Sequence, residues 1–209
     1  MNVRMGDLFS KSEGGSEKIP LPDSDLLYFA DALSTREAKQ YFDELLTQVQ
    51  WREEEVTIWG RRYKQPRLVA WYGDPGTTYS YSGSVLNPLP WTPLLLTLRS
   101  RVEQLANTSF NSVLLNLYRT ERDNMGWHSD DEPELGPQPV IASVSLGETR
   151  EFQLKHKKRK DLPIARISLS DGSVLVMSGP TQASWKHCLK RETEKLGRRI
   201  NLTFRQIIS

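Results

Sequence analysis

The second half of the sequence alternates between short apolar runs and turn residues, and this pattern limits the folds that the chain can adopt. Runs of this length are typical of β-strands, and turns such as 146–148 and 170–173 separate them. So many short strands in succession favour two packed sheets in a jelly roll. We expect strands at residues 113–119, 140–146, 150–155, 164–169, 173–178, 183–189 and 199–207.

The first half of the sequence favours two amphipathic helices. Residues 34–49 begin with Ser34 and Glu37 in the spacing of a capping box, and apolar residues follow at helical intervals. A second helix is expected to start after Thr92, with Pro93 in its first turn. The predicted fold class is therefore α+β, mainly β: a jelly roll buttressed by N-terminal helices.

The length of 209 residues is typical of one domain. Residues 1–20 are polar and are expected to be a mobile tail, and residues 21–209 to form a single domain whose jelly-roll core is 111–209. No apolar run approaches the length of a membrane span, and no signal peptide is recognisable. With one cysteine as well, we expect a cytoplasmic or nuclear protein that is not secreted, and a monomer.

Charge is distributed unevenly along the chain. Residues 155–209 hold 13 Lys and Arg against 4 Asp and Glu, whereas residues 1–154 hold 15 against 22. Much of the excess lies in the run Lys155–Lys160, which contains only Lys, His and Arg. A basic run of this kind favours contact with the phosphates of a nucleic acid, although a solvated hairpin tip is the simpler alternative.

Two of the three histidines form the pattern His128-Ser129-Asp130 with His187 further along the chain. Residues two apart in an extended segment point to the same side, so His128 and Asp130 could bind one metal together with His187. Two imidazoles and one carboxylate suit non-haem Fe(II) and leave positions for other ligands. The pattern is also common by chance, in which case each histidine is merely packed or exposed.

The C-terminal strand alternates strictly, with apolar residues on one face and polar residues on the other. Guanidinium groups bind carboxylates through paired hydrogen bonds, so the polar face is suited to a dicarboxylate; solvent exposure is the alternative. A second strand places Asn116 and Tyr118 on one face, where they could bind the same ligand or only satisfy each other. The polar face of the C-terminal strand carries Arg199, Asn201, Thr203 and Arg205.

Taken in order, these motifs resemble the AlkB family of Fe(II)/2-oxoglutarate-dependent nucleic-acid dealkylases. The resemblance covers residues 53–208 and is closest to the DNA-repair branch, through 72–74 and 78–83. The matching residues are Asn116, Tyr118, His128, Asp130, Asp131, Glu132, His187, Arg199, Asn201, Phe204 and Arg205.

The resemblance implies a double-stranded β-helix, with recognition hairpins in residues 21–110. It also implies an enzyme that holds Fe(II) through His128, Asp130 and His187 and uses 2-oxoglutarate and O2. Arg199, Asn116 and Tyr118 would bind the distal carboxylate of 2-oxoglutarate, Arg205 would lie near its metal-proximal carboxylate, and Asn201 and Thr203 would line the same pocket. The expected reaction is oxidative dealkylation of bases such as N1-methyladenine and N3-methylcytosine in DNA, with release of formaldehyde, succinate and CO2.

Several residues are candidates for binding the alkylated strand. Asp131 and Glu132 could favour a cationic base, Tyr81 could stack on it opposite His128, and Trp59 could fill the gap that a flipped base leaves in a duplex. An acidic surface loop, strand packing and a surface tryptophan are the respective alternatives. The full set of predicted substrate residues is Trp59, Arg61, Tyr72, Tyr79, Tyr81, Asp131, Glu132, Lys157 and Lys158.

Two other functions remain open from the sequence. One is a 2-oxoglutarate oxygenase that acts on RNA, a protein or a small molecule, and the other is a non-catalytic nucleic-acid-binding module. Salt-sensitive DNA binding would separate the first from DNA repair, and metal-dependent succinate release would exclude the second. Residues 7–9 also weakly resemble a peptide that docks on a replication clamp, but they lack its leading glutamine.

Overall fold

The computed structural model describes residues 15–58, 60–77, 79–81, 84–86 and 88–208. Its helices are α1 (Thr35–Gln48), α2 (Pro93–Ala106) and the short α3 (Thr181–Ser184), with one 3-10 turn η2 (Pro133–Leu135). The strands are β1 (Ser16–Lys18), β2 (Asp25–Phe29), β3 (Arg52–Ile58), β4 (Arg61–Gly73), β5 (Tyr79–Tyr81), β6 (Ser84–Leu86), β7 (Ser112–Tyr118), β8 (Met125–His128), β9 (Ile141–Gly147), β10 (Arg150–His156), β11 (Ala165–Leu169), β12 (Val174–Ser178), β13 (Trp185–Leu189) and β14 (Arg199–Arg205).

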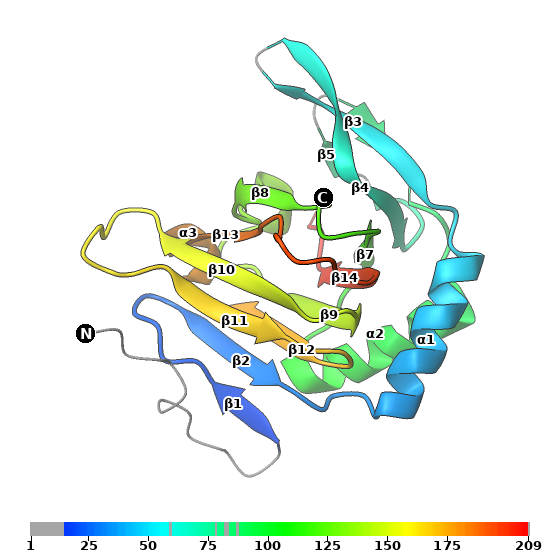
Figure 1. Cartoon of the computed structure of the whole chain (residues 1–209), viewed down its shortest axis with the longest axis horizontal. Coiled ribbons are helices and arrows are strands. Elements are labelled where there is room, and N and C mark those ends of the chain that lie inside the picture. Colours follow the sequence, from blue (N-terminus) through cyan, green and yellow to red (C-terminus); the bar gives the residue numbers. More distant parts are fainter. Residues whose placement is uncertain (1–14, 59, 78, 82–83, 87, 209) are drawn as a thin grey trace.

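The strands form two facing sheets, as Figure 1 shows. The large sheet has the order β1-β2-β12-β9-β14-β7-β4-β3, and the small sheet has the order β11-β10-β13-β8. A separate two-stranded sheet joins β5 to β6. The buried residues between the two main sheets come from both, for example Leu175 and Met177 of β12 and Leu154 of β10. The jelly-roll prediction is therefore confirmed.

Helices α1 and α2 cover the outer face of the large sheet. Leu45 of α1 and Leu98 of α2 belong to one buried cluster with Leu202 and Phe204 of β14. The predicted capping box is present, because the Ser34 hydroxyl accepts a hydrogen bond from Glu37 N and the Glu37 carboxylate accepts one from Ser34 N. Since one face of β14 packs against the helices, its polar face must point between the sheets.

The register between strands β14 and β7 places four polar or aromatic side chains side by side. Arg199 lies opposite Tyr118, and Asn201 lies opposite Asn116. All four side chains are therefore on the inner face of the large sheet, and each is largely buried. A polar side chain that loses water on folding needs hydrogen-bond partners, and a bound ligand could supply some of them on this face.

The structure differs from the sequence-based prediction at several elements. Ser16–Lys18 form β1 and Ile19 is buried, so ordered structure begins inside the segment that we expected to be a tail. The run expected as one strand at 183–189 begins as helix α3 and becomes a strand only at Trp185. Among the described residues, no helix combines the length and apolar character that a membrane crossing requires.

Candidate active site

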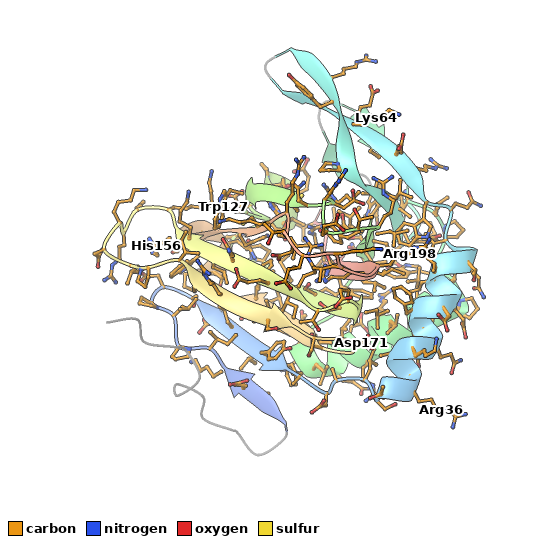
Figure 2. All side chains as sticks on the ribbon, viewed as in Figure 1. Arg36, Lys64, Trp127, His156, Asp171 and Arg198 are labelled. Carbon is orange, nitrogen blue, oxygen red and sulfur yellow. The ribbon has the colours of Figure 1, made fainter. Side chains whose placement is uncertain are left out.

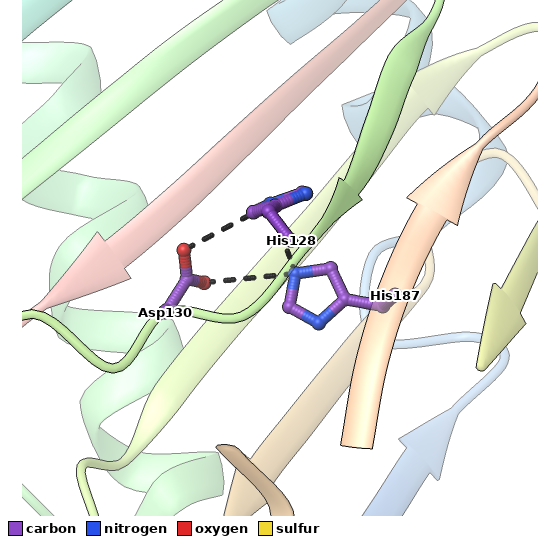
Figure 3. Close-up of side chains that lie close together, drawn as sticks. All are labelled: His128, Asp130 and His187. Atoms are coloured by element: carbon purple, nitrogen blue, oxygen red, sulfur yellow. Dashed lines mark hydrogen bonds and ion pairs between the residues drawn. The ribbon is translucent and has the colours of Figure 1, made fainter. Parts of the chain in front are cut away.

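His128, Asp130 and His187 converge between the two sheets, as Figure 3 shows. Their ligand atoms all lie within 4.8 Å of one another. The two Nε2 atoms are 3.0 Å apart, and the Asp130 carboxylate oxygens lie 4.0 Å from His128 Nε2 and 3.9 Å from His187 Nε2. Two nitrogens and one oxygen directed at a common point are the ligand arrangement of a non-haem Fe(II) site.

Strand pairing explains how residues 59 positions apart in the chain meet. His128 ends β8, and the β8–β13 register places it directly opposite His187. His128 Nδ1 lies 2.8 Å from the carbonyl oxygen of Gly126, so it serves as the donor and leaves Nε2 with a free lone pair. Phe152 of β10 stacks on the His187 ring at 5.1 Å between centroids. Both imidazoles are therefore oriented by the protein itself.

Hydrogen bonds attach the loop after β8 to helix α3 and to the start of β13. The Gln182 side-chain oxygen accepts a hydrogen bond from Asp130 N at 2.9 Å. The Ser129 hydroxyl donates to the Trp185 carbonyl at 3.0 Å. Lys157 Nζ donates to the Gln182 carbonyl at 2.7 Å and also lies 2.8 Å from an Asp131 carboxylate oxygen. These contacts fix the backbone that presents the Asp130 ligand.

The charge states of the cluster favour metal binding. Burial raises the pKa of Asp130, but Arg205, whose Nη2 donates to its carboxylate at 2.7 Å, and the two histidines outweigh this and lower the pKa to about 2. Burial and the neighbouring His128 lower the pKa of His187 to about 3. At neutral pH the carboxylate is thus anionic and the His187 imidazole is neutral, which are the forms that bind a metal.

A small cavity of about 60 Å³ opens beside the cluster on the inner face of the large sheet. All six residues predicted to bind 2-oxoglutarate line it, together with the three metal-site residues. Apolar side chains close the rest of the wall, including Phe152, Leu169 and Met177. The six residues are Asn116, Tyr118, Arg199, Asn201, Thr203 and Arg205.

Arg199 is the main cation of this cavity and is only 2% exposed. Its Nη2 donates to the Ser145 hydroxyl at 2.9 Å, and its guanidinium lies 5.4 Å from the centre of the Tyr118 ring. Within the described residues it forms no ion pair with a carboxylate. Burial lowers the pKa of Arg199 to about 10, and the buried Arg150 adds to this effect. A buried cation without a carboxylate partner suits an anionic ligand.

Hydrogen bonds fix the two asparagine side chains that line this cavity, Asn116 and Asn201. The Asn116 carbonyl oxygen accepts a hydrogen bond from Arg67 Nε at 2.7 Å, which turns its amide group toward Asn201. The Asn201 amide donates to the Ser143 hydroxyl, and its oxygen accepts from Thr203. Asn201 and Thr203 therefore hold each other in place, and Asn116 is fixed by a residue that the sequence did not single out.

A larger cavity of about 290 Å³ lies on the other side of the metal cluster. It shares His128, Asp130 and Arg205 with the smaller one, so the cluster stands between the two. Much of its wall comes from one face of β4, whose alternate residues are Gln65, Arg67, Val69 and Trp71. The alternation of side chains in residues 61–73 is the sequence signal that could have identified this face.

Comparison with known proteins agrees with this geometry. A family model described as the 2OG-Fe(II) oxygenase superfamily matches residues 25–205. The human alpha-ketoglutarate-dependent dioxygenase alkB homolog 3 is 40% identical over 183 residues, which cover 84% of this chain and 63% of that protein. The DNA oxidative demethylase ALKBH2 of Mus musculus is 40% identical over 181 residues, covering 82% and 76%. This chain belongs to the AlkB family.

This chain spans about three fifths of the length of the alkB homolog 3 proteins that it matches. Among solved structures, that of OsALKBH1 is similar with a TM-score of 0.63 at 20% identity, covering 90% of this chain and all of that one. A 2OG-Fe(II) oxygenase family protein from Burkholderia pseudomallei gives a TM-score of 0.55 at 14% identity, covering 86% and 84%. At these identities the likeness shows the fold alone.

The two acidic residues that follow Asp130 in this AlkB-family protein differ in their surroundings. Glu132 lines the larger cavity, and its Oε2 is buried with no hydrogen-bond partner among the described residues. The Asp131 side chain is 55% exposed and forms an ion pair with Lys157. The Lys157 ammonium is thus engaged by Asp131 and by the Gln182 carbonyl, and its contact with phosphate stays a prediction. Lys158 is exposed.

Tyr72 does not lie at either cavity. It is 4% exposed and packs in the cluster beneath the helices, where burial raises the pKa of its hydroxyl. Strand alternation turns the preceding Trp71 toward the larger cavity instead, so the position of Tyr72 gives no support to the predicted substrate contact. Trp59 lies outside the described residues, as do the side chains of Arg61, Tyr79 and Tyr81.

Proposed function

We propose that this protein is an Fe(II)/2-oxoglutarate-dependent dioxygenase that removes alkyl groups from N-alkylated bases in DNA. The observation that carries the proposal is the position of the metal cluster between two cavities of different character. The smaller cavity is lined by the buried Arg199, which forms no ion pair with a carboxylate among the described residues. The larger is lined by the partly buried Glu132, whose Oε2 is buried without a hydrogen-bond partner among them. The name of the relative ALKBH2, DNA oxidative demethylase, supports the same reaction.

The donor set fits the expected metal and cosubstrate. Two imidazole nitrogens and one carboxylate would hold Fe(II), with Arg205 keeping Asp130 ionised. Arg199 and the amide of Asn116 would bind the distal carboxylate of 2-oxoglutarate, beside the Tyr118 ring. When bound, Fe(II), 2-oxoglutarate and O2 supply the oxidation of the N-methyl carbon, which leaves as formaldehyde while succinate and CO2 are released. Apolar walls exclude water from the pocket.

The larger cavity fits a cationic base. Alkylation at N1 of adenine or N3 of cytosine puts a positive charge on the base, and a nearby carboxylate favours that charge. Glu132 provides this carboxylate, whereas Asp131 is already paired with Lys157. The charge of Glu132 would then distinguish these lesions from neutral methylated bases. Trp71, Leu114 and Met125 offer apolar surface for the ring.

The experiment is product analysis by mass spectrometry on single-stranded oligonucleotides, with Fe(II) and 2-oxoglutarate. One carries N1-methyladenine or N3-methylcytosine, and the control carries the neutral 5-methylcytosine. We expect conversion of the cationic bases only, with formaldehyde and succinate in equal amounts. Glu132→Gln keeps the shape of the side chain and should lose most activity, whereas Asp131→Asn should retain more. Conversion of the neutral base at the same rate would contradict the proposal.

Further parts of the proposal rest on the sequence. We infer that duplex DNA is a substrate besides single strands, because the sequence around Trp59 predicts a turn from which its side chain could fill the gap left by a flipped base. Stacking of the base between Tyr81 and His128, and phosphate contacts from Tyr79, Arg61 and Lys158, belong to the same proposal. A monomer in the cytoplasm or nucleus fits this function. Docking of residues 7–9 on a replication clamp is a further part of the proposal.

A further inference from the structure

The outer face of the small sheet carries two lysines that have no acidic partner. Lys155 of β10 and Lys186 of β13 lie directly opposite each other in the strand register, and both are exposed. Within the described residues, neither ammonium forms an ion pair with a carboxylate. Like charges opposite each other in a sheet destabilise it, so this pair lowers stability unless an anion lies between them.

The carboxylate of this face is engaged elsewhere. Glu151 accepts a hydrogen bond from the Gln153 amide and lies 3.7 Å from Arg166, at the β11 side of the sheet. At the opposite side, Trp127 of β8 is half-buried, and Lys155 Nζ lies 4.9 Å from the centre of its ring. The aromatic ring therefore restrains the long Lys155 side chain and keeps its charge near the β8 edge.

This arrangement lies on the outer side of the strand that lines the larger cavity. Trp127 and His128 are neighbours on β8, so their side chains point to opposite faces of the strand. His128 lines the cavity, and β8 is the edge strand of the small sheet. In the view of Figure 2, Trp127 lies between the β3–β4 hairpin, marked by Lys64, and the loop that begins at His156. Only the edge strand separates the outer face from the cavity.

We propose that Trp127, Lys155 and Lys186 form a contact strip for the sugar-phosphate backbone of the nucleotides that flank the target base on one side. This inference rests on the proposed function, because it takes the substrate to be a nucleic acid strand. Once the base has entered the cavity, the flanking nucleotides are held near β8, and their phosphates meet the strip at high effective concentration. Two ammonium groups without carboxylate partners complement two phosphates.

The test is binding of single-stranded oligonucleotides to the full chain, measured by fluorescence anisotropy over a range of salt concentrations. One oligonucleotide is short and only fills the cavity; two longer ones extend it on the 5′ or the 3′ side. The double variant Lys155→Ala/Lys186→Ala should weaken binding of one extended oligonucleotide and leave the short one unchanged. For that strand the slope of log K against log salt should fall by about 1.4, at about 0.7 per phosphate contact.

The matched control is Arg36→Ala/Lys39→Ala, which removes the same charge from α1, distant from the small sheet (Figures 1 and 2). Trp127→Leu keeps both lysines and should weaken the extended oligonucleotide about two- to fivefold without changing the slope. Equal losses on short and extended strands, equal losses in the control pair, or equally effective competition by polyglutamate would each overturn the contact strip.

Failure of the contact strip and failure of the proposed function are distinguishable. Phosphate contacts do not depend on the base, so the strip should act equally on methylated and unmodified strands. Turnover of the methylated base tests the proposed function separately. Loss of the length-dependent effect with normal turnover refutes the strip alone, whereas the length-dependent effect on strands that are never converted supports the strip and refutes demethylation.

Discussion

Replacing Arg199 with methionine should make the ligand-free protein slightly more stable while removing its response to 2-oxoglutarate. The guanidinium is 2% exposed, its Nη2 donates to the Ser145 hydroxyl, and it packs against the Tyr118 ring. Methionine fills a similar volume without a charge, so the variant removes the cation and little of the packing. The variant should be more stable because it no longer buries a charged group, which is unfavourable.

The magnitude follows from the pKa of Arg199. A fall of its pKa from 12.5 to about 10 means that the protein interior destabilises the charged guanidinium by roughly 3 kcal/mol relative to the neutral form. The lost hydrogen bond to Ser145 contributes about 1 kcal/mol in the other direction, and the lost contact with Tyr118 about 1 kcal/mol more. The net gain is on the order of 1 kcal/mol, or about 2–4 °C in Tm for a domain of this size. Binding of the dicarboxylate should weaken by about 2–5 kcal/mol.

The assay is thermal unfolding of the Mn(II)-loaded protein with and without N-oxalylglycine, an analogue of 2-oxoglutarate. Wild-type protein should be stabilised by the analogue, and Arg199→Met should not respond to it. Arg198→Met is the matched control, because that neighbouring arginine is exposed and its loss should leave the response intact. An Arg199→Met protein that loses stability by more than about 2 kcal/mol, yet still responds fully to the analogue, would refute the reasoning.

Three further predictions concern the metal, the loop that carries it and the duplex. Alanine at His128, Asp130 or His187 should remove one of three protein ligands and abolish both iron retention and succinate formation; near-normal turnover in any of them would show a wrong ligand set. Lys157→Met should lower turnover on a methylated strand without changing the salt dependence of binding, since its ammonium contacts Asp131 and the Gln182 carbonyl; a reduced salt slope would indicate a phosphate contact. Trp59→Ala should reduce repair of duplexes more than that of single strands, and equal losses would make Trp59 a packing residue.

Strand alternation was the most informative signal in the sequence. The polar and apolar faces of 199–205 predicted which residues of β14 point between the sheets, because every second residue packs against the helices. The same alternation runs through β4, whose Arg67 and Trp71 line the larger cavity and were not predicted. It could not have found β8, since a strand of four residues is too short to show a period.

Contacts between distant parts of the chain could not be predicted from any local pattern. Lys157 and Asp131 are 26 residues apart, and their pairing depends on how α3 supports both segments. Arg67 and Asn116 are 49 residues apart and meet because β4 and β7 are neighbours in the large sheet. Sequence reasoning identified the chemical types in the site, but only the sheet order reveals which charges neutralise each other.

The two histidines that we propose as metal ligands stand opposite each other on neighbouring strands, and one of these strands, β8, is the four-residue edge of its sheet. An ion held by both imidazoles would act as a cross-link between the edge strand and β13. Loss of the ion should then require β8 to separate locally from β13. The rate of metal dissociation should therefore depend on this opening as well as on the strength of the metal–ligand bonds. Amide hydrogen exchange in Met125–His128 should accordingly slow when metal binds, while exchange in the interior strands of the large sheet stays unchanged.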